Sequence, residues 1–339
     1  MKFTLLYTVI ILLLSISSSY GQNRALTITG RVLDEETGIP LSNVNVFLAN
    51  TTFGTTTEKT GEFSLTNIPY GNYDIIFSYV GYEQEKRNFY SYEARTFHYN
   101  ISLKQKVITL TQVNVTAAVP ENWKEDLKIF TRIFIGEGKN SDKTRILNPE
   151  VLNFIRDDNS SILKAVSDSI IRIENRSLGY TLYIFLDWLE YNVKDGSIKF
   201  MLYPRFSELT PSSEEERHTW EDKRKSTYLN SSKYFFYALV HKQLNMDYSL
   251  KSGEDNIYQD DLSITSNSDS TIFEFRFQGD LLVRRHLGPP SSLAFLYPSV
   301  SIDKYGNLFS PYLNVIIGGI WADQRIADML PLNYIYTDK

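Results

Sequence analysis

The sequence contains no cysteine among its 339 residues. This absence excludes structural disulfides, thiol catalysis and cysteine-ligated zinc. It also removes the cysteine that carries the lipid of a bacterial lipoprotein, so we do not expect a lipoprotein. The folded chain must therefore be held together by packing and hydrogen bonds alone.

Histidine is scarce, and the usual catalytic motifs are missing. The four histidines are His98, His218, His241 and His286. None of them forms the His-Glu-x-x-His pair that a zinc peptidase needs. No Gly-x-Ser-x-Gly elbow, Walker loop or dinucleotide-binding glycine motif is present. The sequence therefore predicts no catalytic residue and no cofactor.

Two further features resemble sites only superficially. Asp303, Gly306 and Asn307 match part of a calcium loop, but the alternating oxygen ligands and the closing glutamate are missing. This stretch favours a β-turn, with a metal site as the minor alternative. The pairs Gly136-x-Gly138 and Gly318-Gly319 are more typical of turns and bulges than of phosphate-binding loops. No metal site is predicted.

The chain also lacks a strong charge of either sign. It has 35 Lys and Arg against 40 Asp and Glu, a net charge of −5. A weakly acidic chain without basic runs argues against nucleic acid as a partner. Beyond the N-terminus, no apolar run reaches the 18 or so residues of a membrane helix, so no transmembrane span is expected in the mature chain.

The N-terminus is typical of an export signal. Lys2 supplies the positive charge, and residues 5–16 form an apolar run that is short for a membrane span. Ser19 and Gly21 are small residues at the positions that precede cleavage before Gln22. Residues 1–21 are therefore predicted to be a signal peptide rather than an uncleaved anchor. The mature protein is expected in the periplasm, on the outer membrane or outside the cell.

Residues 22–104 carry the pattern of short strands punctuated by glycine and proline. Val44, Val46 and Leu48 alternate with more mixed residues, a period of two that suits a strand. Residues 34–38 read as an acidic turn that ends in glycine. This spacing predicts an all-β antiparallel sandwich or barrel.

The two segments GRVLDEETGIPLSNVNVFL and TGEFSLTNIPYGNYDIIFSYVGYE resemble the carboxypeptidase-like regulatory domain of exported Bacteroidetes proteins. The resemblance implies a transthyretin-like (prealbumin-like) Greek-key sandwich. It covers about 80 residues. In metallocarboxypeptidases this domain is an accessory and not the peptidase, so the resemblance implies no catalytic residue.

The segment that follows, residues 105–120, is predicted to be a linker strand. It resembles the segment after the same domain in TonB-dependent outer-membrane transporters. The remaining stretch of about 220 residues is too short for a plug and a 22-stranded barrel, since each strand takes roughly 10 residues before loops. A transporter is therefore not the favoured interpretation.

Residues 121–339 are predicted to form an α+β domain. Trp123, Leu127, Phe130 and Phe134 follow helical spacing. Asn148 is expected to cap a short helix that begins at Pro149. Residues 179–193 form a long strand on which Trp188 shares a face with Tyr180, Leu182, Ile184 and Leu186. Helices are expected at 214–228 and 232–244, and strands from 256 onward. The stretch resembles the tail of Bacteroidetes proteins known only by their regulatory domain, which implies no activity.

The favoured function is that of a non-enzymatic, exported cell-envelope protein with an interaction or docking β-sandwich. The alternative is a carbohydrate- or peptide-binding accessory protein with its site in the C-terminal domain, because tyrosine is abundant, with 23 copies. A hydrolase with an unrecognised carboxylate site comes third. The expected partner is an envelope protein or a glycan.

Overall fold

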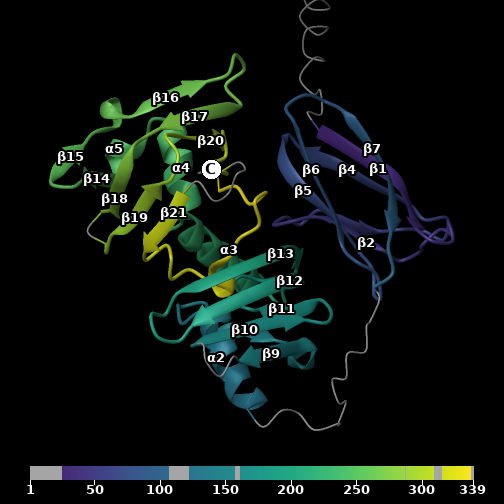
Figure 1. The fold of residues 1–339 in the computed structure, drawn as a ribbon. Helices are drawn as coiled ribbons and strands as arrows, with labels where there is room; N and C mark the ends of the chain where they lie inside the picture. The colour runs from purple at the N-terminus through teal and green to yellow at the C-terminus, as the bar shows by residue number, and fades with distance from the viewer. Residues whose placement is uncertain (1–24, 107–121, 157–160, 287, 309–314, 337–339) are drawn as a thin grey trace, which may run out of the picture.

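The computed structural model describes residues 25–106, 122–156, 161–286, 288–308 and 315–336. The predicted signal peptide, with its cleavage site at Gly21 and Gln22, lies outside these residues, and so do residues 107–120 of the predicted linker strand. Figure 1 shows a β-sandwich beside a larger C-terminal region that contains both helices and sheets. No helix in the described ranges combines the length and the apolar character needed to cross a membrane.

The N-terminal part folds as two β-sheets that pack face to face. One sheet has the strand order β4-β1-β7 and the other β3-β2-β5-β6. The strands are β1 (Ala25–Asp34), β2 (Asn45–Leu48), β3 (Gly54–Thr56), β4 (Glu62–Pro69), β5 (Gly71–Ser78), β6 (Glu85–Ser91) and β7 (Thr96–Leu103). Strand β1 pairs with β4 in antiparallel and with β7 in parallel orientation. The predicted all-β sandwich is confirmed, but the sheets are not wholly antiparallel, because β1 and β7 run parallel.

Alternating side chains from both sheets fill the sandwich. Val44, Val46 and Leu48 are fully buried, as the period of two predicts. Gly30 lies where β1 meets β7, and a Cβ atom there would sit 1.8 Å from the carbonyl oxygen of Tyr99. Only glycine permits so close an approach of the two backbones.

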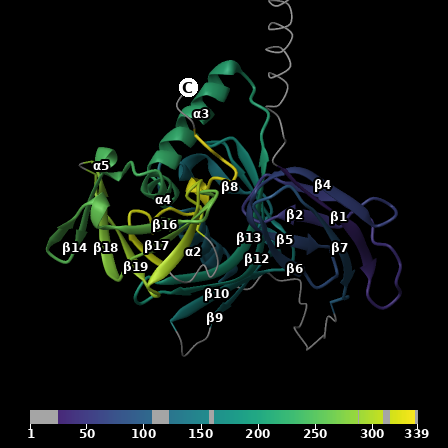
Figure 2. The ribbon, with the colours of Figure 1, turned by 90° about the horizontal axis from the view of Figure 1, so that it is seen from above.

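The first part of the C-terminal region is a six-stranded sheet covered on one face by a helix (Figures 1 and 2). Its elements are α2 (Trp123–Ile135), β8 (Thr144–Ile146), β9 (Leu152–Arg156), β10 (Ile162–Ser167), β11 (Ile171–Asn175), β12 (Tyr180–Asn192) and β13 (Ile198–Glu208). The strand order is β8-β11-β12-β10-β9, and β13 pairs with β12. The helix predicted from Trp123, Leu127, Phe130 and Phe134 is confirmed.

A bulge in β12 overturns one prediction. The register against β13 shifts between Leu186 and Trp188, which leaves Asp187 as the extra residue. A bulge bends its strand and reverses the alternation beyond it. Leu186 and Leu189 are therefore buried, whereas Trp188 faces outward and is 39% exposed. The prediction that Trp188 shares the inner face was wrong.

The rest of the chain adds helices and two smaller sheets. The elements are α3 (Glu214–Leu229), α4 (Ser232–Val240), α5 (Leu244–Asp247), β14 (Tyr248–Ser252), β15 (Asp255–Ile257), β16 (Ser263–Ser266), β17 (Ile272–Arg276), β18 (Gly279–Arg285), β19 (Ser291–Phe295), β20 (Ser299–Asp303) and β21 (Val315–Gly319). One sheet is ordered β15-β14-β18-β19-β21 and the other β16-β17-β20. The predicted α+β class is confirmed. Helix α4 ends at Val240, before the predicted Leu244.

The C-terminal region contains two hydrophobic clusters. One joins α2 to the six-stranded sheet and includes Ile326 and Ala327 from near the end of the chain. The other joins α4 to the smaller sheets. The side-chain amide of Asn175 donates to the carbonyl of Ala327 at 2.9 Å, across 152 residues. The boundary of one domain at 121–339 stays a prediction.

The predicted cap at Asn148 is wrong. Pro149–Val151 forms one short 3-10 turn, and the side chain of Asn148 makes no capping hydrogen bond to it. Its amide instead donates to the carbonyl of Ile170 at 2.9 Å, and its oxygen accepts from the N–H of Arg172 at 2.7 Å. The buried side chain thus pairs the backbone groups of Ile170 and Arg172 at the start of β11. A capping rule based on local sequence cannot predict these contacts.

Backbone hydrogen bonds fasten the sandwich to the C-terminal region at residues 50–52. The N–H of Asn50 donates to the carbonyl of Pro204 at 2.6 Å, and the N–H of Phe206 donates to the carbonyl of Thr51 at 2.9 Å. The N–H of Leu332 donates to the carbonyl of Asn50 at 2.7 Å. The loop after β2 is therefore held between β13 and the end of the chain.

Side chains extend this junction over the outer face of the sandwich. Phe47, Ala49 and Ile76 are buried against Tyr203 of β13. Lys86 Nζ lies 5.1 Å from the centre of the Tyr203 ring. The mixed side of β2 is thus also buried, because the C-terminal region covers it.

Candidate functional site

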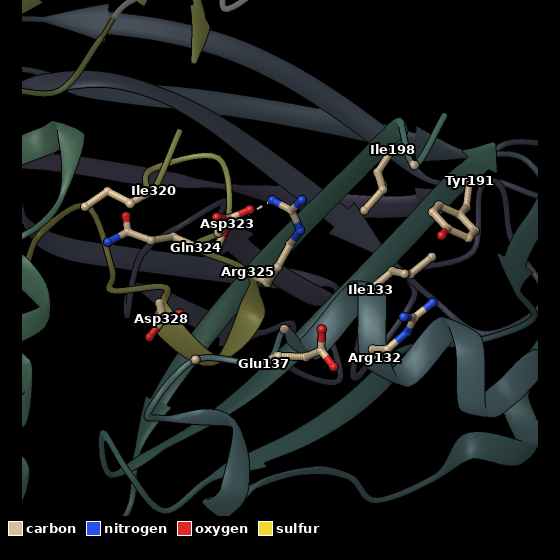
Figure 3. A pocket seen from close by; sticks show the side chains of 13 residues that line it. Arg132, Ile133, Glu137, Tyr191, Ile198, Ile320, Asp323, Gln324, Arg325 and Asp328 are labelled. Carbon is tan, nitrogen blue, oxygen red and sulfur yellow. Dashed lines mark hydrogen bonds between the residues drawn. The ribbon is translucent and has the colours of Figure 1, made fainter. Parts of the chain in front are cut away.

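A cleft of about 540 Å³ opens between α2, the β12–β13 hairpin and the segment after β21 (Figure 3). The cleft is lined by residues that lie far apart in the sequence, so no local sequence motif predicts it. The polar lining side chains are Arg132, Glu137, Tyr191, Asp323, Gln324, Arg325 and Asp328. This volume is within the range of small-molecule sites.

Arg325 is a partly buried cation of the cleft. Its guanidinium donates to the carbonyl of Ala322. Gly136, at the end of α2, has a φ of +93°, and a Cβ atom there would lie 2.9 Å from the Cβ of Arg325. Glycine at the helix end therefore lets the arginine stem pass. Burial lowers the pKa of Arg325.

Asp328 is held on the same side of the cleft. The side-chain amide of Asn140 donates to Asp328 Oδ1 at 2.8 Å. A Cβ atom on Gly138 would lie 3.1 Å from Asp328 Oδ2. Burial raises the pKa of Asp328, and the hydrogen bond from Asn140 opposes this shift. The two glycines noticed in the sequence thus serve as close-approach points, consistent with their expected role in turns.

The opposite wall of the cleft is partly apolar. Tyr191 and Ile198 face each other across the β12–β13 pairing, and Ile133 of α2 lies beside them. Within the described residues, the side chains of Tyr191 and Arg132 make no hydrogen bond or ion pair, so both side chains retain free hydrogen-bonding capacity. The arrangement offers an aromatic face, cationic donors and carboxylate acceptors to one small ligand.

A second candidate lies on the outer face of the six-stranded sheet. We define the outer patch as Ile155, Val166, Trp188 and Met201, contributed by four adjacent strands. Trp188 lies opposite Met201. Ile155 is 55% and Met201 41% exposed. A hollow of about 410 Å³ adjoins the patch, bordered by the Lys164–Glu190 ion pair at 2.8 Å.

The outer patch continues a surface that the protein already uses for packing. Along β12 and β13, the pair Phe185 and Tyr203 precedes the pair Trp188 and Met201. Tyr203 is covered by the sandwich. One end of this sheet face is therefore buried by protein, and the other end is open.

The residues singled out in the sequence do not converge. The four histidines occupy separate positions: His98 on β7, His218 on α3, His241 just after α4 and His286 just after β18. In the part of the chain that the structure describes, no group of three or more His, Asp and Glu side chains could hold a metal ion.

The loop at Asp303 is a turn, as the sequence favoured. The carboxylate of Asp303 accepts from the N–H groups of Tyr305 and Asn307 at 2.8 and 2.9 Å. It also accepts from the side-chain amide of Asn307 at 2.8 Å. Burial raises the pKa of Asp303. The carboxylate oxygens of Asp303 thus accept hydrogen bonds from donors within the same loop.

Comparison with known proteins identifies the sandwich. Residues 28–115 match the family model described as CarboxypepD_reg-like domain. The TonB-dependent receptor P39 of Formosa agariphila is 35% identical over 78 residues, which are 23% of this chain. The match spans only 7% of that receptor. The fold shared at this identity is that of the transthyretin-like sandwich.

Solved structures offer only weak likenesses. A putative carbohydrate binding protein from Bacteroides uniformis is 10% identical, with 82% of this chain and 98% of that chain covered and a TM-score of 0.20. GBS52, the minor pilin of Streptococcus agalactiae, is 16% identical, with 24% of this chain and 44% of that chain covered and a TM-score of 0.20. At these TM-scores the likenesses carry no argument about function.

Proposed function

We propose that this chain, whose N-terminal sandwich is a CarboxypepD_reg-like domain, is a non-enzymatic interaction protein of the cell envelope. Its sandwich is docked on the chain's own C-terminal region. The surface offered to a protein partner is the outer patch beside that junction.

The observation that carries this proposal is the open apolar end of the six-stranded sheet. Trp188 and Met201 form one exposed cross-strand pair. Exposed contiguous apolar surface of this kind marks interaction sites, and tryptophan is enriched among the residues that dominate binding energy. The neighbouring Lys164–Glu190 pair supplies the polar rim that such interfaces have.

A protein is the favoured occupant because protein already covers the same face. The sandwich buries Tyr203 with Phe47, Ala49 and Ile76. The outer patch lies one cross-strand pair further along β12 and β13, and it has the same mixture of aromatic and aliphatic groups. A partner would extend an interface whose first half is intramolecular.

Two observations support an envelope location. The N-terminal sequence has the pattern of a signal peptide cleaved before Gln22. The curated relative that shares the sandwich is a TonB-dependent receptor. An accessory regulatory-like domain also fits a binding role better than catalysis.

The test is a pull-down from native envelope with tagged mature protein and with the variant Trp188→Ala. We expect one reproducible protein that the variant fails to retain. The matched control is Tyr258→Ala, an exposed aromatic side chain outside the outer patch. Recovered proteins and glycans are both identified by mass spectrometry.

Two results would contradict the proposal. A partner that Trp188→Ala retains as well as the wild type binds elsewhere. Recovery of glycan without any protein would move the function to the carbohydrate-binding alternative. Circular dichroism of both variants checks that each is folded.

A further inference from the structure

The cleft of Figure 3 carries charges of both signs. Two arginines, Arg132 and Arg325, line it together with three carboxylates, Glu137, Asp323 and Asp328. An anionic ligand would meet three carboxylates, and a cationic ligand would meet two guanidinium groups. A neutral ligand rich in hydroxyls suits both, since each hydroxyl donates to a carboxylate and accepts from an arginine.

The apolar wall adds a second requirement. Tyr191, Ile198 and Ile133 offer a flat face with a polar tip at the tyrosine hydroxyl. The hydroxyl-rich ligand must therefore also have a face of C–H groups. Sugar rings combine these two properties.

The polar groups are held before any ligand arrives. The Arg325 side chain packs against Gly136 and donates to the carbonyl of Ala322, and Asp328 accepts from the side-chain amide of Asn140. Fixed donors and acceptors lower the entropy cost of binding. Arg132 and Glu137 are exposed at the rim of the cleft and remain adjustable.

We propose that this cleft binds a neutral saccharide of one or two sugar rings, with the ring face on Tyr191 and the hydroxyls between Arg325 and Asp328. The site is separate from the outer patch, and the proposal does not depend on the protein partner. The volume of about 540 Å³ accommodates such a ligand.

The test is saturation-transfer NMR and calorimetry on the mature chain with glucose, N-acetylglucosamine, cellobiose and maltose. We expect saturable binding of at least one of these sugars. Tyr191→Ala should weaken it at least tenfold because the ring face is lost, and Tyr191→Phe should retain most of it. Arg132→Ala, an exposed position, should weaken it severalfold without affecting folding.

The matched controls are Tyr258→Ala and Arg276→Ala, which change the same residue types on exposed surface away from the cleft. Both should bind sugar as the wild type does. The proposal is overturned if none of the four sugars binds, or if Tyr191→Ala binds them as well as the wild type does.

Discussion

The sandwich and the C-terminal region are built by different means. In the sandwich, neighbouring strands bury alternate residues, and the core can be read along β1, β2 and β5. In the C-terminal region, buried asparagines join segments that are 152 and 188 residues apart, at Asn175 and Asn140. A core made of local alternation can be inferred from sequence, whereas a core closed by distant polar contacts cannot.

Gly30→Ala should break the sandwich and leave the C-terminal region folded. The new Cβ would clash with the carbonyl of Tyr99, at 1.8 Å. We expect a loss of about 3 kcal/mol or more in the free energy of unfolding of the sandwich. Hydrogen exchange over residues 25–103 measures it. All four tryptophans lie beyond residue 120, so their fluorescence reports the C-terminal region separately.

The matched control is Gly38→Ala. Gly38 has a φ of +68°, but nothing lies within 4 Å of a Cβ atom there. Gly38→Ala should therefore cost only the backbone strain of a positive φ, about 1 kcal/mol of unfolding free energy. Equal losses in the two variants would show that the close approach of β1 and β7 is not what requires glycine.

Asn175→Ala should break the C-terminal region and spare the sandwich. The fully buried side chain donates to Ala327 and accepts from the N–H groups of Ser177 and Leu178, both at 3.0 Å. Removing it leaves three buried backbone groups unpaired, at a cost of about 2–4 kcal/mol. Denaturant unfolding followed by tryptophan fluorescence measures the loss.

Asn192→Ala, at the end of the neighbouring strand β12, provides the comparison. Its side chain also accepts a backbone N–H, that of Lys194, but it does so at an exposed turn. Water can replace this bond, so we expect about 0.5 kcal/mol or less. If both variants lose a similar amount of unfolding free energy, burial does not explain the contribution of Asn175.

The same contrast explains what the sequence predicted. The strands of the sandwich and helix α2 follow from local pattern. Trp188 was placed on the wrong face because one extra residue, Asp187, inverts the alternation. The pattern around such a bulge is indistinguishable from a regular strand until the partner strand is known.

The candidate sites were harder to predict than the fold. The cleft combines α2, a hairpin and residues 320–328, so its parts come together only in the folded chain. The glycines Gly136 and Gly138 were visible, but their neighbours Arg325 and Asp328 were not. The burial of Phe47 likewise required knowledge of Tyr203.

Lys233 gives the C-terminal region a pH dependence. Its ammonium donates to the carbonyls of Leu332 and Tyr334 at 2.6 and 3.0 Å. Burial lowers the pKa of Lys233 from 10.5 to about 8, while Asp303 opposes the shift. Between pH 8 and 10.5 the unfolded chain binds a proton that the folded chain does not, so stability should rise with pH in this window.

The variant Lys233→Met isolates this contribution. The difference in unfolding free energy between wild type and variant should move by up to about 2 kcal/mol in favour of the wild type between pH 8 and 9.5. Burial raises the pKa of Tyr228, which therefore stays protonated in this window. A difference that does not change with pH would mean that Lys233 keeps its ordinary pKa in the folded chain.

Asn333→Ala should loosen the junction between the two regions without unfolding either. The side chain of Asn333 accepts from the N–H of Thr52 at 3.1 Å and donates to the Thr52 hydroxyl at 2.7 Å. Each bond contributes about 1 kcal/mol, and the backbone bonds of Asn50 and Thr51 remain. The expected result is faster hydrogen exchange at residues 50–52 alone, with both unfolding transitions unchanged. If exchange instead rises throughout the sandwich, the C-terminal region stabilises the whole sandwich, and the two regions are one cooperative unit.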